Sequence, residues 1–324
     1  MNERTDLQDK VGDYLAEHRR MGFKSRSVGL LLASFARYVA ETGHHGPLTV
    51  SLMVGWAHMD KKQSQKRETW AHRLKCLKPF TRWMRQFEPL TEVPDEAIFG
   101  PSPRRVAPHI YTEGEIVELL KAARKLNPQS GLRPVVFETL FGLIAATGLR
   151  VSEALSLLDT DVDLKNGALT VRMTKFRKSR QLPLHPSTVA ALARYRQLRS
   201  MQVPTNPDTA FFIATRGRLL GQPLQERQVH RVFLQLRNQI GIVDRGFHGG
   251  PRIHDLRHSF VVRRLMLWYA QGIDVDQAML SLSTYLGHAK ISNTYWYLTG
   301  VPELMTLVGS RFERYTQGKE AGDE

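Results

Sequence analysis

The sequence predicts a mainly α-helical protein with one small antiparallel β-sheet, arranged as two domains. Apolar residues recur at helical spacing through the first ninety residues, and only residues 168–184 read as strands. Between these regions, residues 89–110 contain five prolines and lack periodicity, which is typical of an extended linker. We therefore expect a helical domain over 1–90, a linker over 91–110, a mixed α/β domain over 111–316 and a disordered tail over 317–324.

Four helices are expected in the first domain. Helical spacing joins Val11, Tyr14 and Leu15 in the first of them. The third helix is expected over 50–59 and the fourth over 65–87, where Pro79 predicts a kink. The second helix carries Leu30, Leu31, Phe35 and Tyr38 on one face.

The second domain opens with a capping box at Thr112-Glu-Gly-Glu115, which predicts a helix through Arg124. A further helix over 135–146 ends at Gly148, and Arg150 opens the next one. Asn166-Gly167 predicts a hairpin turn beside the strand 168–173, which pairs through a polar turn with a strand at 181–184. From Gln225 to about Glu313 the pattern is helical again.

The chain is strongly basic. Lys and Arg number 46 against 31 Asp and Glu, which gives a net charge of +15 and a pI of about 10.1. Such an excess favours a polyanionic partner, with nucleic acid ahead of an acidic membrane surface. No apolar run approaches the length of a membrane-spanning helix, and the N-terminus has no apolar signal core. Cys76 is the single cysteine, which excludes a disulfide framework and a thiolate metal cluster. We expect a cytoplasmic, nucleoid-associated protein.

Positive charge is concentrated along residues 61–85, on and just before the fourth helix, where Glu68 is the one acid among nine cations. Such a run can be an ordinary solvated face, but in this basic chain it favours a surface that follows DNA phosphates. The candidate DNA-binding residues on it are Lys61, Lys62, Lys66, Arg67, Arg73, Lys75, Lys78, Arg82 and Arg85. The hairpin turn adds Arg177, Lys178 and Arg180.

The stretch HDLRH at 254–258 has the two-histidine spacing of a zinc-binding helix. However, Asp255 replaces the glutamate of that motif, Arg257 adds a permanent cation, and no third ligand is evident. That composition repels a metal ion and attracts a phosphate. We therefore expect no metal here, with Asp255 and His258 in structural roles.

Six motifs in this order resemble the tyrosine recombinase (phage integrase) family. The N-terminal stretch RLKCLKPFTRWM is similar to the last helix of the family's core-binding domain. The other motifs are a T-G-x-R element with an acid three residues on, a hairpin lysine, an H-x-x-R box, an L-G-H box and a tyrosine nine residues later. They correspond to Arg150, Glu153, Lys175, His254, Arg257, His288 and Tyr297.

The resemblance implies cleavage of DNA without metal or nucleotide cofactors. Tyr297 is expected to attack the phosphate and form a 3′-phosphotyrosine, rather than its neighbour Tyr295. The remaining roles implied are phosphate binding by Arg150 and Arg257, proton donation by Lys175, proton removal by His254, a hydrogen bond to the phosphate from His288, and orientation of neighbours by Glu153.

The implied biological role is integration or transposition of a mobile element. Dimer resolution, a non-cleaving DNA-binding protein of this fold and a type IB topoisomerase remain alternatives. The implied partners are double-stranded DNA with paired inverted half-sites, three further copies of the chain in a tetramer, and accessory recombinases or DNA-bending proteins. An apolar C-terminal set is expected to dock on a neighbouring protomer, the alternative being its own domain: Val301, Leu304, Met305, Leu307, Val308 and Phe312.

Overall fold

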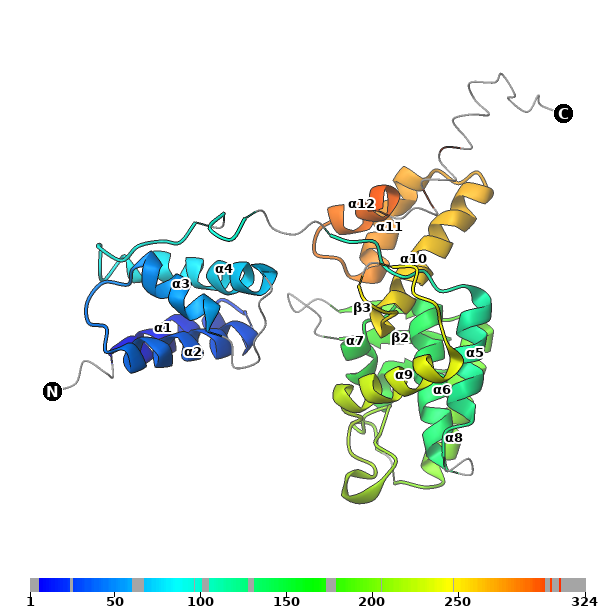
Figure 1. Cartoon of the computed structure of the whole chain (residues 1–324). Coiled ribbons are helices and arrows are strands. Elements are labelled where there is room, and N and C mark those ends of the chain that lie inside the picture. The colour runs from blue at the N-terminus through cyan, green and yellow to red at the C-terminus, as the bar shows by residue number, and fades with distance from the viewer. Residues whose placement is uncertain are drawn as a thin grey trace. The chain divides into compact units, whose positions relative to one another are not determined.

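The computed structural model describes a defined part of the chain, comprising residues 6–23, 26–59, 67–95, 97–100, 105–127, 131–172, 179–204, 206–246 and 248–300, with 304 and 309. The chain divides into two units, Met1–Arg104 and Arg105–Glu324 (Figure 1). This division falls inside the segment expected to be a linker. No helix in the described ranges is long and apolar enough to span a membrane.

The first unit contains the four expected helices around their own core. Phe35, Trp56, Leu77 and Phe80 are buried together at its centre. Pro79 lies inside the fourth helix, which continues past it. The helices are α1 (Asp6–Arg20), α2 (Arg26–Thr42), α3 (Val50–His58) and α4 (Arg67–Met84).

The second unit is helical apart from one antiparallel sheet. Its strands have the order β1 (Val162–Asp163), β2 (Ala168–Val171), β3 (Arg180–Pro183), with the buried Leu169 opposite Leu182. The sheet confirms the predicted hairpin and adds β1 to it. The helices are α5 (Glu113–Arg124), α6 (Leu132–Thr147), α7 (Val151–Leu155), α8 (Pro186–Ser200), α9 (Glu226–Ile240), α10 (Ile253–Ala270), α11 (Val275–Leu286) and α12 (Ser292–Gly300).

Two local features fix where helices of the second unit begin and end: a capping box at the start of α5 and a glycine turn between α6 and α7. The predicted capping box is present, since Thr112 and Glu115 exchange hydrogen bonds at the start of α5. At the end of α6, Gly148 has a φ of 65°, and a Cβ there would lie 2.6 Å from the ring of Phe260. A side chain would therefore clash as well as strain the backbone. Glycine allows the chain to turn sharply here, so that Arg150 emerges at the start of α7.

A separate apolar cluster joins the last helices of the second unit. It packs Val261, Leu265, Met279 and Leu286 around the side chain of Tyr297. Residues of α10, α11 and α12 therefore form one packed group (Figure 1).

Candidate active site

The predicted catalytic residues that the structure describes lie in the second unit, at the ends or on the faces of helices. Arg150 is the N-cap of α7, Arg257 and His254 lie on α10, and His288 follows the left-handed Gly287 that ends α11. Contacts between side chains and backbone link several of these elements. The predicted catalytic Lys175 lies outside the described residues, as do Arg177 and Lys178 of the same turn.

Glu153 is the electrostatic centre of the arginine cluster. Its carboxylate accepts from Arg150 Nη1 at 2.7 Å and from Arg180 Nη2 at 3.0 Å, and Arg257 Nη1 lies 4.0 Å away. Burial opposes ionisation, but the hydrogen bond and charge of Arg180, together with Arg150, hold the pKa of Glu153 below its usual value. Three guanidinium groups around one carboxylate leave an excess of positive charge, as expected for an anion-binding site.

The position of Arg180 corrects the prediction that it belongs to an exposed DNA-binding turn. The residue opens strand β3, and its side chain is only 11% exposed. Besides Glu153, its Nε donates to the carbonyl of Tyr285 at 2.7 Å. Because its guanidinium is bonded to both Glu153 and the Tyr285 carbonyl, Arg180 positions Glu153 and does not extend into solvent.

Arg257 and Arg150 tie together the ends of α6 and α11. Arg257 is buried and donates to the carbonyls of Gly148 at 2.6 Å and Leu286 at 2.8 Å. Burial and the neighbouring Arg150 lower the pKa of Arg257 to about 10, so it remains a cation at neutral pH. Arg150 donates to the Gly287 carbonyl at 3.3 Å, yet its side chain is 33% exposed. Arg150 is therefore the arginine of this pair that is accessible to a ligand.

His288 is oriented by Thr294, a residue that none of the sequence motifs pointed to. Its Nδ1 lies 2.7 Å from the hydroxyl of Thr294, which is buried one turn before Tyr297. Burial and the charges of Arg257 and Arg150 lower the pKa of His288 to about 3, so its ring is neutral at pH 7. Contact through Nδ1 leaves Nε2 as the nitrogen for a further partner.

His254 lies on the exposed side of α10, beside the arginines. Surrounding protein atoms, followed by Arg257 and Arg252, lower its pKa to about 4. A neutral imidazole is the form that can accept a proton. Its ring meets the ring of His258 edge to face, with centroids 4.8 Å apart.

The two candidate tyrosines have different surroundings. The Tyr297 hydroxyl lies 2.7 Å from Nδ1 of His258, and both side chains are buried, at 1% and 5% exposure. Tyr295 instead donates to Asp276 at 3.3 Å. Tyr297 is thus the tyrosine directed toward the arginine cluster, but its partner is His258, for which a purely structural role was expected, and not the predicted base His254.

Asp255 has the structural role expected of it. Its buried carboxylate accepts from the Arg252 backbone at 2.8 Å and from Arg252 Nη2 at 2.7 Å, which closes the first turn of α10. Across the part of the chain that the structure describes, no group of three or more His, Cys, Asp and Glu side chains could hold a metal ion.

The predicted DNA-binding residues on and around α4 differ in how exposed their side chains are. Arg67, Lys75, Arg82 and Arg85 are exposed. Arg73 is not available in the same way, because it donates to the carbonyl of Ala57 at 2.9 Å and to that of Met59, closing the end of α3. Arg73 therefore also has a structural role, and its contact with DNA stays a prediction. Lys78 is half-buried, while Lys61, Lys62 and Lys66 lie outside the described residues.

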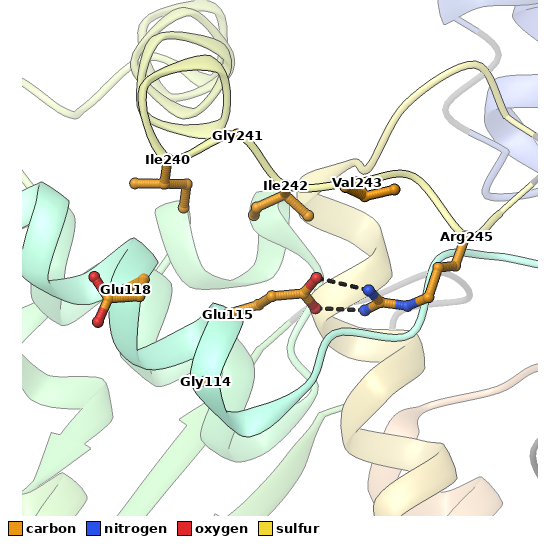
Figure 2. Close-up of a pocket in the computed structure, with 8 residues that line it drawn as sticks. All are labelled: Gly114, Glu115, Glu118, Ile240, Gly241, Ile242, Val243 and Arg245. Carbon is orange, nitrogen blue, oxygen red and sulfur yellow. Dashed lines mark hydrogen bonds and ion pairs between the residues drawn. The ribbon is translucent and has the colours of Figure 1, made fainter.

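A hollow of about 300 Å³ lies elsewhere in the second unit, between the start of α5 and the loop after α9. Figure 2 shows the Arg245 guanidinium facing the carboxylate of Glu115 on one side, and Ile240 and Ile242 on the other. None of the predicted catalytic residues lines it. It is therefore not the site of the chemistry implied by the arginine cluster.

Comparison with known proteins gives matches over most of the chain. The profile of the phage integrase family matches residues 110–301. An integrase/recombinase (y4rB) of Sinorhizobium fredii is 35% identical over 95% of this chain and 97% of its own length. Tyrosine recombinase XerC of Alcanivorax borkumensis is 27% identical over 77% of this chain and 75% of its own.

Two solved structures share the fold at low sequence identity. The Tn1549 transposon integrase in complex with transposon right end DNA is 16% identical, with a TM-score of 0.65 over 94% of this chain and 99% of that one. A lambda integrase dimer bound to a COC′ core site is also 16% identical, with a TM-score of 0.60 over 90% and 76%. Both support the mainly helical fold with a small sheet.

Proposed function

The chain belongs to the phage integrase family and is a tyrosine recombinase, and from this premise we propose that it integrates or transposes a mobile element by cleaving DNA through Tyr297. The observation that carries the choice of nucleophile is the placement of the Tyr297 hydroxyl beside α10, next to Arg257 and His258. Tyr295 is paired with Asp276 instead.

The reaction exchanges one phosphoester bond for another. The Tyr297 oxygen attacks the scissile phosphorus, a bond forms between them, and the bond from phosphorus to the 5′-oxygen breaks. The tyrosine proton passes to His254, and the departing 5′-oxygen takes a proton from Lys175. A 5′-hydroxyl from another strand then attacks the phosphotyrosine and releases Tyr297, so no nucleotide is consumed.

Positive charge does the work that a metal ion could otherwise do. Arg150 and Arg257 hold the non-bridging oxygens and stabilise the additional charge of the transition state. Glu153 and Arg180 keep Arg150 in position, and His288 turns its Nε2 side to the phosphate while Nδ1 contacts Thr294. Arg257 must exchange at least one of its carbonyl partners for a phosphate oxygen.

The first prediction tests the nucleophile with a nicked suicide substrate in excess EDTA. Tyr297→Phe removes the attacking oxygen, so we expect normal DNA binding but no covalent adduct on a denaturing gel. Tyr295→Phe is the matched control, because it loses a hydroxyl two residues away and keeps the adduct. Adduct formation by Tyr297→Phe, or its loss in wild type when only the metal is chelated, contradicts the mechanism. A complete absence of adduct with the wild-type protein on its cognate site instead favours a non-cleaving DNA-binding role.

The mobile-element role is supported by the greater identity and coverage shared with the integrase/recombinase than with XerC. The proposed substrates are paired inverted half-sites, filled by four copies of the chain with or without accessory recombinases or DNA-bending proteins. Sequencing of DNA trapped on Tyr297 in cells tests this role. Adducts at the two ends of a mobile element support it, whereas adducts at a single housekeeping site in each replicon favour dimer resolution.

A further inference from the structure

We propose that His258 is a positioning residue that stores the Tyr297 hydroxyl inside the catalytic unit of the DNA-free protein, and that cleavage requires this hydrogen bond to be exchanged. The inference rests on the proposed role of Tyr297 as nucleophile. It concerns a step before the chemistry, in which the nucleophile is withheld from DNA.

Burial shows that Tyr297 is in a stored position. Its side chain is 1% exposed and packs in the same apolar cluster as Val261, Leu265 and Met279. In-line attack needs the oxygen within about 3–3.5 Å of the phosphorus, with no protein between them. A phosphodiester in a DNA duplex cannot enter a packed interior, so the tyrosine must turn outward before it can react. That movement breaks the 2.7 Å contact with His258.

The charges around His258 distinguish storage from proton removal. The ring is faced by His254, Arg105, Arg252 and Arg257, and burial followed by these groups lowers its pKa to about 2. Burial raises the pKa of the Tyr297 hydroxyl above its usual value. Proton transfer from Tyr297 to His258 is therefore unfavourable, because burial disfavours both the imidazolium and the phenolate that it would create. Neutral His258 shares a hydrogen bond with the hydroxyl but does not deprotonate it.

The same helix provides a route for release. On α12, Thr294 holds His288, Trp296 packs under Arg105 at 3.9 Å, and Tyr297 is held by His258. His288 is a proposed phosphate ligand. Arg105 lies close enough to lower the pKa of Tyr297. A DNA phosphate that binds His288 or Arg105 changes the contacts these residues make with α12. DNA binding is thereby coupled to the movement of Tyr297.

Two amide substitutions of His258 test the proposal with a matched pair. His258→Asn places an acceptor near the position of Nδ1 and should keep the hydrogen bond, whereas His258→Gln places it near Nε2 and should lose it. In the DNA-free protein, nitration of Tyr297 by tetranitromethane is measured by mass spectrometry, with Tyr295 as the internal reference. We expect nitration to rise roughly threefold to tenfold in the Gln variant, as for loss of one neutral hydrogen bond, and to stay near wild type in the Asn variant.

The second readout is the single-turnover rate of adduct formation at saturating suicide substrate. Storage predicts that the Gln variant forms the adduct at least as fast as wild type, since the step that frees Tyr297 becomes easier. Equal Tyr297 nitration in all three proteins overturns the proposal. Loss of adduct in the Gln variant with retention in the Asn variant also overturns it, because His258 would then act in the chemistry. If the Gln variant does not fold, His258→Phe takes its place with the same expectations.

The nitration assay needs no cleavage, so it separates this inference from the proposed function. If Tyr297→Phe still forms an adduct, the nucleophile is another residue and the proposed mechanism fails. The nitration comparison still reports whether His258 shields Tyr297.

Discussion

Glu153 and Arg180 illustrate how a charged pair can act on a site without touching the ligand. Arg180 contacts both carboxylate oxygens of Glu153, at 3.2 and 3.0 Å, and a backbone carbonyl. The same carboxylate holds Arg150. Without Arg180, Glu153 is left with Arg150 as its close partner, and the more exposed guanidinium is drawn away from a phosphate.

Arg180→Gln should therefore lower the adduct-forming rate while leaving DNA affinity within about twofold. Loss of charge-assisted hydrogen bonds corresponds to about a tenfold to hundredfold change in rate. Arg180→Lys should recover little, since an ammonium group cannot reproduce the bidentate contact. Arg172→Gln is the control, because Arg172 pairs with Asp161 at the end of the neighbouring strand and is largely exposed. A weaker affinity and a reduced salt dependence in Arg180→Gln, with an unchanged rate, contradict the positioning role.

At this scale the sequence predicts residue types better than it predicts partners. The arginines, His288 and Tyr297 are predicted as site residues because each belongs to a short motif. The partner of Tyr297 was missed, because His258 contacts it across 39 positions of the chain. One signal was available: His254 and His258 are four residues apart and share a face of α10, so either could meet the tyrosine.

Helix α4 shows what spacing alone can establish about an element. In the sequence, Trp70, Leu74, Leu77 and Met84 form an apolar stripe at helical spacing, and Leu74, Leu77 and Met84 are buried in the core. The opposite face cannot be assigned residue by residue, since the role of Arg73 depends on carbonyls at the end of α3. Helix α8 was not predicted at all. Its buried positions include Arg199, whose partners Asp159 and the Phe211 carbonyl lie in other segments.

The prediction at the element scale concerns three exposed cations, Lys75 and Arg82 on α4 and Arg85 directly after it. Lys75, Arg82 and Arg85 lie within about 80° of one another at 100° per residue, so one DNA backbone can reach all three. Changing all three to Gln should weaken binding to any duplex, and the log–log salt slope should fall by roughly 0.9 for each phosphate that is no longer neutralised. Filter binding over a salt series measures this slope.

Arg73→Gln provides the control for this element. It removes one positive charge from the same helix but breaks the hydrogen bonds that close α3, so we expect a lower melting temperature with little change in the salt slope. An unchanged slope in the triple variant means that this face of α4 does not meet DNA.

At the scale of the whole molecule, the sequence predicts two units because apolar periodicity stops where the prolines begin. The division between Arg104 and Arg105 falls inside the segment expected to link them. Assembly is harder to predict, since an apolar helix face looks the same whether it packs in its own domain or on a neighbour. Leu304 makes the difficulty concrete. It is 0% exposed and belongs to the cluster that surrounds Tyr297 in its own unit.

Truncation before Leu304 therefore cannot test assembly, because losing a buried leucine side chain costs about 2–5 kcal/mol of stability. The other apolar residues of the C-terminal set lie outside the described residues and remain candidates for docking on a neighbouring protomer.

The double variant Val308→Asp with Phe312→Asp keeps Leu304 and disrupts such docking. We expect wild-type melting and wild-type binding to a single half-site, but loss of cooperative filling of paired half-sites in gel-shift titrations. Leu304→Ala is the control for packing within the unit, with a lower melting temperature in the free monomer. Full cooperativity in the double variant rules out docking through these two residues, and a lowered monomer melting temperature places them in their own domain.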